Sequence, residues 1–328
     1  MRLPLQAAAA AIPLLSFLRP RHRIPAMSAG VSWEFRKELP RQVEEAGVAA
    51  LDGRLYVAGG DGPDGAVYAD LWRYDPANDS WEELPPLPQP LNHPATIGCN
   101  GKLYAFGGHP HPAGMVSSNK TCIFDPKANR WETGADMPTP RGAAGIAVLG
   151  GKIYVVGGRN TGYPLSGGIA PALNVVEAYD PAADAWERKA PMNIARDHVI
   201  VEELGGKLYA VGGRSYTLLN TMNAAEAYDP KAGRWAVTQP APVPISGLNA
   251  MKFNGKMLFP GTVSGAFLLP DFLAYSPRRG WSNLGPVPKP GYGYGCAVID
   301  GVGYAVGGGP TLLNRFSSLV RAVRLKGV

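Results

Sequence analysis

The sequence predicts an all-β fold, a six-bladed β-propeller whose blades are four-stranded antiparallel sheets, and three observations lead to it. Glycine (42) and proline (32) are too abundant among the 328 residues for a helical protein, because both destabilise helix interiors. Double glycines follow most of the regularly spaced tryptophans by 26 residues. These tryptophans recur at intervals of 46 to 55 residues: Trp33, Trp81, Trp131, Trp186, Trp235 and Trp281. Six copies of a repeat of this length indicate a propeller.

Each repeat is expected to form four strands, a to d, as the third repeat illustrates. Strand a covers residues 145–148, strand b covers 152–156 and strand c covers 174–179, while strand d contains Trp186. A glycine turn at Gly150 joins the first two strands. The double glycine that ends strand b allows backbones to approach one another near the propeller axis, where a Cβ would clash.

The two ends of the chain are expected to meet in the sixth blade. Residues 319–325 form a closing strand without the tryptophan of the other repeats. The N-terminal strand around Trp33 is therefore expected to complete this blade, which removes a free sheet edge. The fifth repeat has Gly261 in place of a double glycine, so that blade is expected to be locally irregular.

Residues 1–30 are expected to be an N-terminal extension or a targeting leader, followed by the propeller of residues 31–328. Residues 1–26 contain four arginines, no acid and an apolar stretch that is broken by Pro13. The stretch is short for a membrane helix, so we expect no membrane span. Met27 is an alternative start. We expect a cytoplasmic protein, or an organellar or secreted one if residues 1–26 are a cleaved leader.

The net charge of +6 does not indicate a nucleic-acid partner, because the basic excess lies at the two ends of the chain. Four arginines in residues 1–26 and four basic residues in 311–328 contribute 8 positive charges, which leaves about −2 for the chain between them. We therefore expect a propeller that binds no nucleic acid, and we expect it to be a monomer.

Four repeats share an aromatic–Asp–Pro turn that begins seven residues before the tryptophan: Tyr74-Asp75-Pro76, Phe124-Asp125-Pro126, Tyr179-Asp180-Pro181 and Tyr228-Asp229-Pro230. Together with the double glycines, these turns closely resemble kelch repeats over residues 31–328. The resemblance implies a six-bladed β-propeller. It is expected to stand alone, without a BTB domain. The commonest use of such propellers is to bind a protein partner.

The candidate binding surface is the face on which the d–a and b–c loops emerge. The b–c loops carry the length variation of the repeats while the rest of each repeat is nearly constant, which is typical of a binding face on a rigid scaffold. At the channel mouth on this face, blades three and four contribute four arginines: Arg141, Arg159, Arg196 and Arg214. Four guanidiniums suit a carboxylate, a phosphate or an acidic peptide, because the planar fork pairs bidentately. Alternatively, Glu177 and Glu226 in strands c neutralise arginines structurally.

Further candidate ligand contacts on this face are Asp61, His93, His109, Tyr163, Tyr216 and Tyr292. Three histidines of blade two, His93, His109 and His111, are weak candidates for metal ligands. The segment that contains His109 and His111 has no short-spacing ligand motif, so we expect no metal and no other cofactor.

Two functions are compatible with this mouth. The first is a kelch-type binding module that presents the loop face to an acidic peptide or protein partner. The second is an enzyme with an acidic small-molecule ligand, similar to the sialic-acid mutarotases, which would isomerise an anionic sugar. In that case the arginines would hold the sugar carboxylate, and His109, His198 or Asp197 would move the proton.

Overall fold

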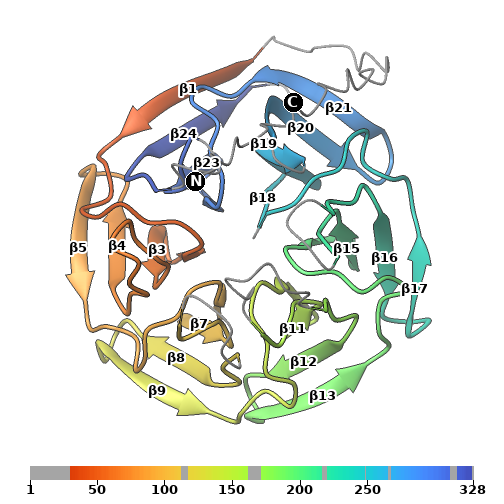
Figure 1. The fold of residues 1–328 in the computed structure, drawn as a ribbon, viewed down its shortest axis with the longest axis horizontal. Helices are drawn as coiled ribbons and strands as arrows, with labels where there is room; N and C mark the ends of the chain where they lie inside the picture. The colour runs from red at the N-terminus through yellow and green to blue at the C-terminus, as the bar shows by residue number, and fades with distance from the viewer. Residues whose placement is uncertain are drawn as a thin grey trace, which may run out of the picture.

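The computed structural model describes residues 30–111, 117–161, 171–215, 220–247, 249–264, 267–310 and 316–326. Six four-stranded antiparallel sheets stand in a ring around a central channel (Figure 1), which confirms the six-bladed propeller. The described residues form strands and turns without any helix, and so without a helix that could cross a membrane.

The strands of each blade follow one another from the channel outward. Blades one to three consist of β2 (Gly47–Leu51), β3 (Arg54–Ala58), β4 (Leu71–Asp75) and β5 (Ser80–Leu84); β6 (Ala95–Cys99), β7 (Lys102–Phe106), β8 (Thr121–Asp125) and β9 (Arg130–Gly134); and β10 (Gly145–Leu149), β11 (Lys152–Val156), β12 (Val176–Asp180) and β13 (Ala185–Lys189). Blades four to six consist of β14 (Ile200–Leu204), β15 (Lys207–Val211), β16 (Ala225–Asp229) and β17 (Arg234–Val237); β18 (Met251–Phe253), β19 (Lys256–Ser264), β20 (Phe267–Ser276) and β21 (Gly280–Pro286); and β22 (Gly295–Ile299), β23 (Val302–Val306), β24 (Val320–Leu325) and β1 (Val31–Arg36). The third blade matches its predicted strands to within two residues.

The N-terminal strand closes the ring, as predicted. β1 pairs antiparallel with β24 over its whole length, from Val31 opposite Leu325 to Arg36 opposite Val320. Trp33 on β1 also packs edge-on against Phe272 of blade five, with 5.1 Å between the ring centroids. The first strand of the propeller is therefore the outermost strand of its last blade (Figure 1).

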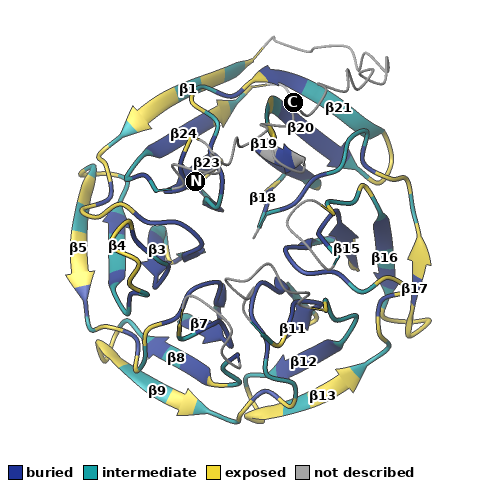
Figure 2. Ribbon diagram, viewed as in Figure 1, coloured by how far each residue is buried: buried dark blue, intermediate teal, exposed yellow. Residues whose placement is uncertain are grey.

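The hydrophobic core is divided into six clusters, each of which lies between two adjacent blades. In the cluster between blades four and five, for example, Val211, Ile245 and Phe259 are buried. Figure 2 shows the consequence: the inner strands are buried, whereas the outermost strands, such as β5, β9 and β13, expose much of their surface. Each blade is thus stabilised mainly by its neighbours, as expected for a repeat that cannot bury its faces alone.

The repeat tryptophans connect successive blades. The indole of Trp81 donates a hydrogen bond to Lys37 O in the segment after the preceding outer strand (2.9 Å), and Trp131 donates in the same way to Pro85 O (2.8 Å). Within the blade, Tyr74 of the aromatic–Asp–Pro turn packs against Trp81 at 4.9 Å between centroids. The turn and the tryptophan therefore form one unit, which explains their constant spacing.

The double glycines occur where two blades approach most closely. Gly59 has a φ of +65°, and a Cβ built on it would lie 2.1 Å from Leu91 O of the next blade. A Cβ built on Gly107 would likewise lie 2.0 Å from Arg141 O. Only glycine satisfies both the left-handed backbone and this separation.

Gly59→Ala is expected to lower the free energy of unfolding by more than about 2 kcal/mol, because backbone strain adds to a clash with a neighbouring backbone. The matched control is Gly53→Ala, in the β2–β3 turn, where φ is +71° but no atom lies within 4 Å of the added methyl group. The free energy of unfolding of this control is expected to fall by about 1 kcal/mol. Urea unfolding measures the stability of both variants. Equal losses of stability would show that the close contact with Leu91 does not add to the cost of the left-handed backbone.

Blade five is irregular, as its sequence predicted. β19 does not end at Gly261 but continues to Ser264, and its pairing with β20 shifts between Pro260 and Thr262. A second shift occurs between β20 and β21. Without the double glycine, the strand continues towards the loop face instead of turning away from its partner.

Candidate functional site

The channel mouth on the loop face, meaning the face that carries the d–a and b–c connections, is built by a short second ladder beyond the double glycines. In five blades the residue after the double glycine forms a bridge with the residue that leads into strand a: Asp61 with Glu44, His109 with Asn92, Arg159 with Gly142, Arg214 with Asp197, and Gly309 with Tyr292. In blade five the equivalent Val263 lies within β19. Backbone pairing therefore fixes the positions from which these side chains enter the mouth.

A second set of equivalent residues encircles the axis next to this ladder. Backbone hydrogen bonds link them from blade to blade: Glu45 N to Gly293 O (2.8 Å), His93 N to Glu45 O (2.8 Å), Ala143 N to His93 O (3.1 Å), His198 N to Ala143 O (2.8 Å) and Gly247 N to His198 O (3.1 Å). We call these six residues the axial ring. Its four non-glycine members adopt left-handed φ values of 48° to 53°, a conformation that is common for glycine and uncommon for other residues.

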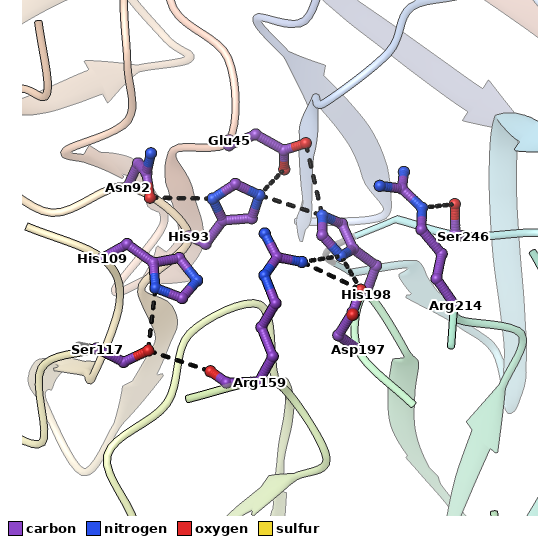
Figure 3. Close-up of polar contacts among 10 residues, drawn as sticks. All are labelled: Glu45, Asn92, His93, His109, Ser117, Arg159, Asp197, His198, Arg214 and Ser246. Carbon is purple, nitrogen blue, oxygen red and sulfur yellow. Dashed lines mark hydrogen bonds and ion pairs between the residues drawn. The ribbon is translucent and has the colours of Figure 1, made fainter. Parts of the chain in front are cut away.

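Histidine and carboxylate side chains meet inside the axial ring (Figure 3). His198 Nδ1 donates to Asp197 Oδ1 at 2.5 Å, and His93 Nδ1 lies 3.1 Å from Asn92 Oδ1. The Nε2 atoms of the two histidines face each other at 3.1 Å. Glu45 Oε2 lies 3.4 Å from His93 Nε2, and the other oxygen of Glu45 lies 3.8 Å from His198 Nε2.

The protonation of this cluster follows from its burial. Desolvation lowers the pKa of His93 to about 4, so its imidazole is neutral at pH 7. Desolvation, together with the nearby Arg159 charge, also holds the pKa of His109 well below its usual range. Asp197 is the opposite case: burial opposes its ionisation, but His198 and Arg159 outweigh burial and hold its pKa below the ordinary value.

The four arginines of the sequence prediction divide into two pairs. Arg141 forms an ion pair with Glu177 at 2.5 Å, and all four side chains of this pair and of the Arg196–Glu226 pair (2.9 Å) are fully buried. Both arginines also donate to backbone carbonyls of their own blades. This geometry corresponds to the structural alternative for Arg141 and Arg196, in which glutamates of strands c neutralise them.

Arg159 and Arg214, in contrast, take part in the network at the mouth. Arg159 Nη1 lies 3.3 Å from Asp197 Oδ1. Arg214 Nε donates to Ser246 Oγ at 3.0 Å, and its guanidinium stands over the ring of Tyr292, 5.5 Å from the centroid. Both side chains are almost completely buried.

The other predicted site residues have different surroundings. His109 Nδ1 contacts Ser117 Oγ at 3.0 Å, and its ring packs over Gly142, where any Cβ would lie 2.7 Å from Nε2. His111 is exposed, and neither it nor His109 joins the group of His93. Asp61 is half-buried beside Glu44. Tyr163 and Tyr216 lie outside the described residues.

The sequence prediction missed Glu45, and it also missed the polar partners Asn92, Ser117 and Ser246. A signal existed, because Glu45, His93 and His198 each stand twelve residues after a repeat tryptophan. The arginines at the entry to strand a, such as Arg141, lie two residues earlier in the same alignment. Aligning all six repeats at the later position would have placed the carboxylate and the two imidazoles in one ring.

Comparisons with known proteins agree with this architecture. Residues 31–194, half of the chain, match a family model described as the KLHDC2/KLHL20/DRC7 Kelch-repeats domain, and residues 201–241 match the Kelch motif. Over 60 residues the chain is 45% identical to human Kelch-like protein 4 and 48% identical to mouse Kelch-like protein 1. Each alignment covers 18% of this chain and 8% of the length of the relative.

Proposed function

This chain belongs to the kelch-repeat family, and on that premise we propose that it is a protein-binding module whose loop face receives an acidic segment of a partner protein. The observation that carries the proposal is the separation of the four arginines into two structural and two mouth residues. Arg159 and Arg214 enter the mouth from adjacent blades, at equivalent positions directly after the double glycines.

A carboxylate suits these two side chains. A guanidinium has five N–H donors in a planar fork, and a carboxylate takes two of them in parallel. Because Arg159 and Arg214 are only 3% and 2% exposed, a flat protein surface cannot reach them, so the proposed partner inserts a single acidic side chain or its terminal carboxylate. The rest of the segment would then contact the surrounding b–c loops.

The isomerase alternative has weaker support in this geometry. The Asp197–His198 pair resembles an acid–base dyad, since the carboxylate orients the imidazole through Nδ1. The second nitrogen of His198, however, faces His93 Nε2 and Glu45 rather than the arginines.

The proposal also takes the propeller to be a cytoplasmic monomer. Closure by β1 leaves no blade incomplete, which supports a self-sufficient ring. Light scattering coupled to size-exclusion chromatography tests the monomer; a defined dimer peak would contradict it.

Arg214→Lys is expected to weaken binding of acidic peptides about 10-fold or more, because lysine keeps the charge but loses the bidentate fork. The probe is a library of fluorescent ten-residue acidic peptides, each with a free or an amidated C-terminus, measured by fluorescence anisotropy. The matched control is Lys102→Ala, which removes a cation at the a–b turn of blade two, on the opposite face. Unchanged affinity in a folded Arg214→Lys variant, or equal losses in both variants, would contradict the proposal.

A further inference from the structure

Three ligand-type atoms converge at the propeller axis. The Nε2 atoms of His93 and His198 and a carboxylate oxygen of Glu45 all lie within 4.8 Å of one another. The residues come from blades one, two and four, and the hydrogen bonds of the axial ring hold their backbones. The convergence is therefore a property of the closed propeller and not of one flexible loop.

The partners of the two histidines determine which nitrogen carries the hydrogen. A carboxylate can only accept, so His198 Nδ1 is the protonated nitrogen in its contact with Asp197. His93 Nδ1 likewise donates to the side-chain oxygen of Asn92. The Nε2 atoms, which face each other at 3.1 Å next to the Glu45 carboxylate, are therefore the nitrogens that can share a cation, either a proton or a metal ion.

We propose that Glu45, His93 and His198 form a binding site for a divalent transition-metal ion such as Zn²⁺. Two imidazoles and one carboxylate are a common ligand set for such ions. With ligand bonds of about 2.0–2.2 Å, the ligand atoms of a tetrahedral zinc are about 3.3–3.6 Å apart. The two Nε2 atoms are 3.1 Å apart, and Glu45 places one oxygen 3.4 Å from His93 Nε2 and the other 3.8 Å from His198 Nε2, so small side-chain adjustments suffice.

The surroundings of the cluster have the features of a second coordination shell. Metal-bound histidines usually donate their other N–H to a carboxylate or an amide oxygen, which fixes the ring and raises its basicity. Asp197 and Asn92 perform this role for the two histidines. Glu45 Oε2 is buried and makes no hydrogen bond within the part of the chain that the structure describes.

The backbone places the three ligand residues at equivalent positions of the axial ring. Glu45, His93 and His198 have φ values of 53°, 52° and 48°, and Ala143, which offers no ligand atom, has a φ of 53°. The equivalent positions of blades five and six carry glycine, Gly247 and Gly293. The left-handed conformation therefore belongs to the ring as a whole, and it presents the three ligand side chains from the same backbone geometry.

A small cavity lies next to the backbone that carries two of the ligands. Its volume of about 10 Å³ is enough for about one water molecule, and residues of the inner strands line it, including Ala46, Pro94 and Ala144. Ala46 and Pro94 directly follow the ligands Glu45 and His93 in the chain. A zinc ion with three protein ligands takes a water molecule as its fourth ligand.

Metal binding can be tested on the full-length, tag-free protein. After treatment with EDTA and removal of the chelator, the protein is dialysed against Zn²⁺ alone and bound metal is measured by mass spectrometry. We expect one Zn²⁺ per chain, and a rise in Tm of about 3–5 °C at a 100-fold excess of Zn²⁺ over its Kd. Mg²⁺ and Ca²⁺, which prefer oxygen ligands, are expected to have no such effect. Absence of bound zinc in the folded protein would overturn the proposal and leave a proton shared between His93 and His198.

Variants distinguish this site from adventitious zinc binding. His93→Gln and His198→Gln are each expected to weaken zinc binding about 100-fold or more, and Asp197→Asn about 10- to 100-fold, since Asp197 contacts the ligand His198 rather than the metal. The matched control is His109→Gln, a buried histidine of the same mouth that is outside the cluster; it should retain full binding.

Where a variant unfolds, the visible absorption of Co²⁺ in the wild-type protein gives an independent readout, since nitrogen and oxygen ligands in a tetrahedral site produce strong d–d bands. Retention of zinc in both folded histidine variants, or its loss in His109→Gln, would refute the assignment. The test does not involve acidic peptides, so its outcome is separate from that of the proposed function.

Discussion

Glu226→Ala is expected to lower the free energy of unfolding by about 3–5 kcal/mol, because it leaves the guanidinium of Arg196 buried without its counter-charge. Both side chains are fully buried, with 2.9 Å between Arg196 Nη2 and Glu226 Oε1. Glu226 also accepts hydrogen bonds from the backbone and side-chain nitrogens of Asn193, so its loss leaves two further donors unpaired. Urea denaturation of the wild type and the variant measures the difference.

An exposed pair provides the matched control for this prediction. Arg73 and Glu82 are paired across neighbouring strands of blade one at 2.5 Å, but their side chains are 30% and 59% exposed. Glu82→Ala is expected to change the free energy of unfolding by less than about 1 kcal/mol, because water solvates the remaining arginine. A loss in Glu226→Ala no greater than that in Glu82→Ala would contradict a structural role for the buried pair.

Removal of residues 1–36, which deletes β1, is expected to destabilise the propeller by more than about 4 kcal/mol and to promote association. The deletion removes the six-residue pairing with β24 and the contact of Trp33 with Phe272. It also exposes the edge of β24, whose residues Val320, Ala322 and Val323 are buried in the complete blade. An unpaired apolar edge is a template for pairing with another chain.

Thermal unfolding with simultaneous light scattering measures both effects of this deletion. The control is a chain that lacks only residues 1–26 and keeps β1 intact; its Tm is expected to equal that of the full-length protein. If the 37–328 chain were monomeric and as stable as this control, closure by β1 would not be required for stability.

The blade architecture was predictable because its determinants are local. Trp81, the Tyr74 turn and the glycines that follow Trp81 lie in constant register within one repeat, and each contributes a contact that depends on that register. Even the irregular fifth blade was indicated by a single missing glycine beside Gly261. Contacts at such short range leave a pattern that a single sequence reveals.

The candidate site was predictable only in part. The sequence placed Arg141 and Arg159 at one mouth, but it left open whether Glu177 would neutralise Arg141. The answer depends on the direction of the Arg141 side chain at the entry to strand a. In the structure this side chain points into its own blade and forms an ion pair of 2.5 Å with Glu177. Arg159, in contrast, stands directly after the double glycine, and its side chain lies beside Asp197 at the mouth.

The sequence by itself determined the number of blades, their strands, the closure by β1 and the face on which the variable loops lie, since each follows from a period or from a missing element. Only the tertiary structure decided which side chains meet at the axis. Glu45 and His198 are 153 residues apart; their common spacing from a repeat tryptophan assigns both to the axial ring, but it does not say whether their side chains touch. Their contact arises because six blades close into a ring narrow enough for side chains from blades one, two and four to touch across it.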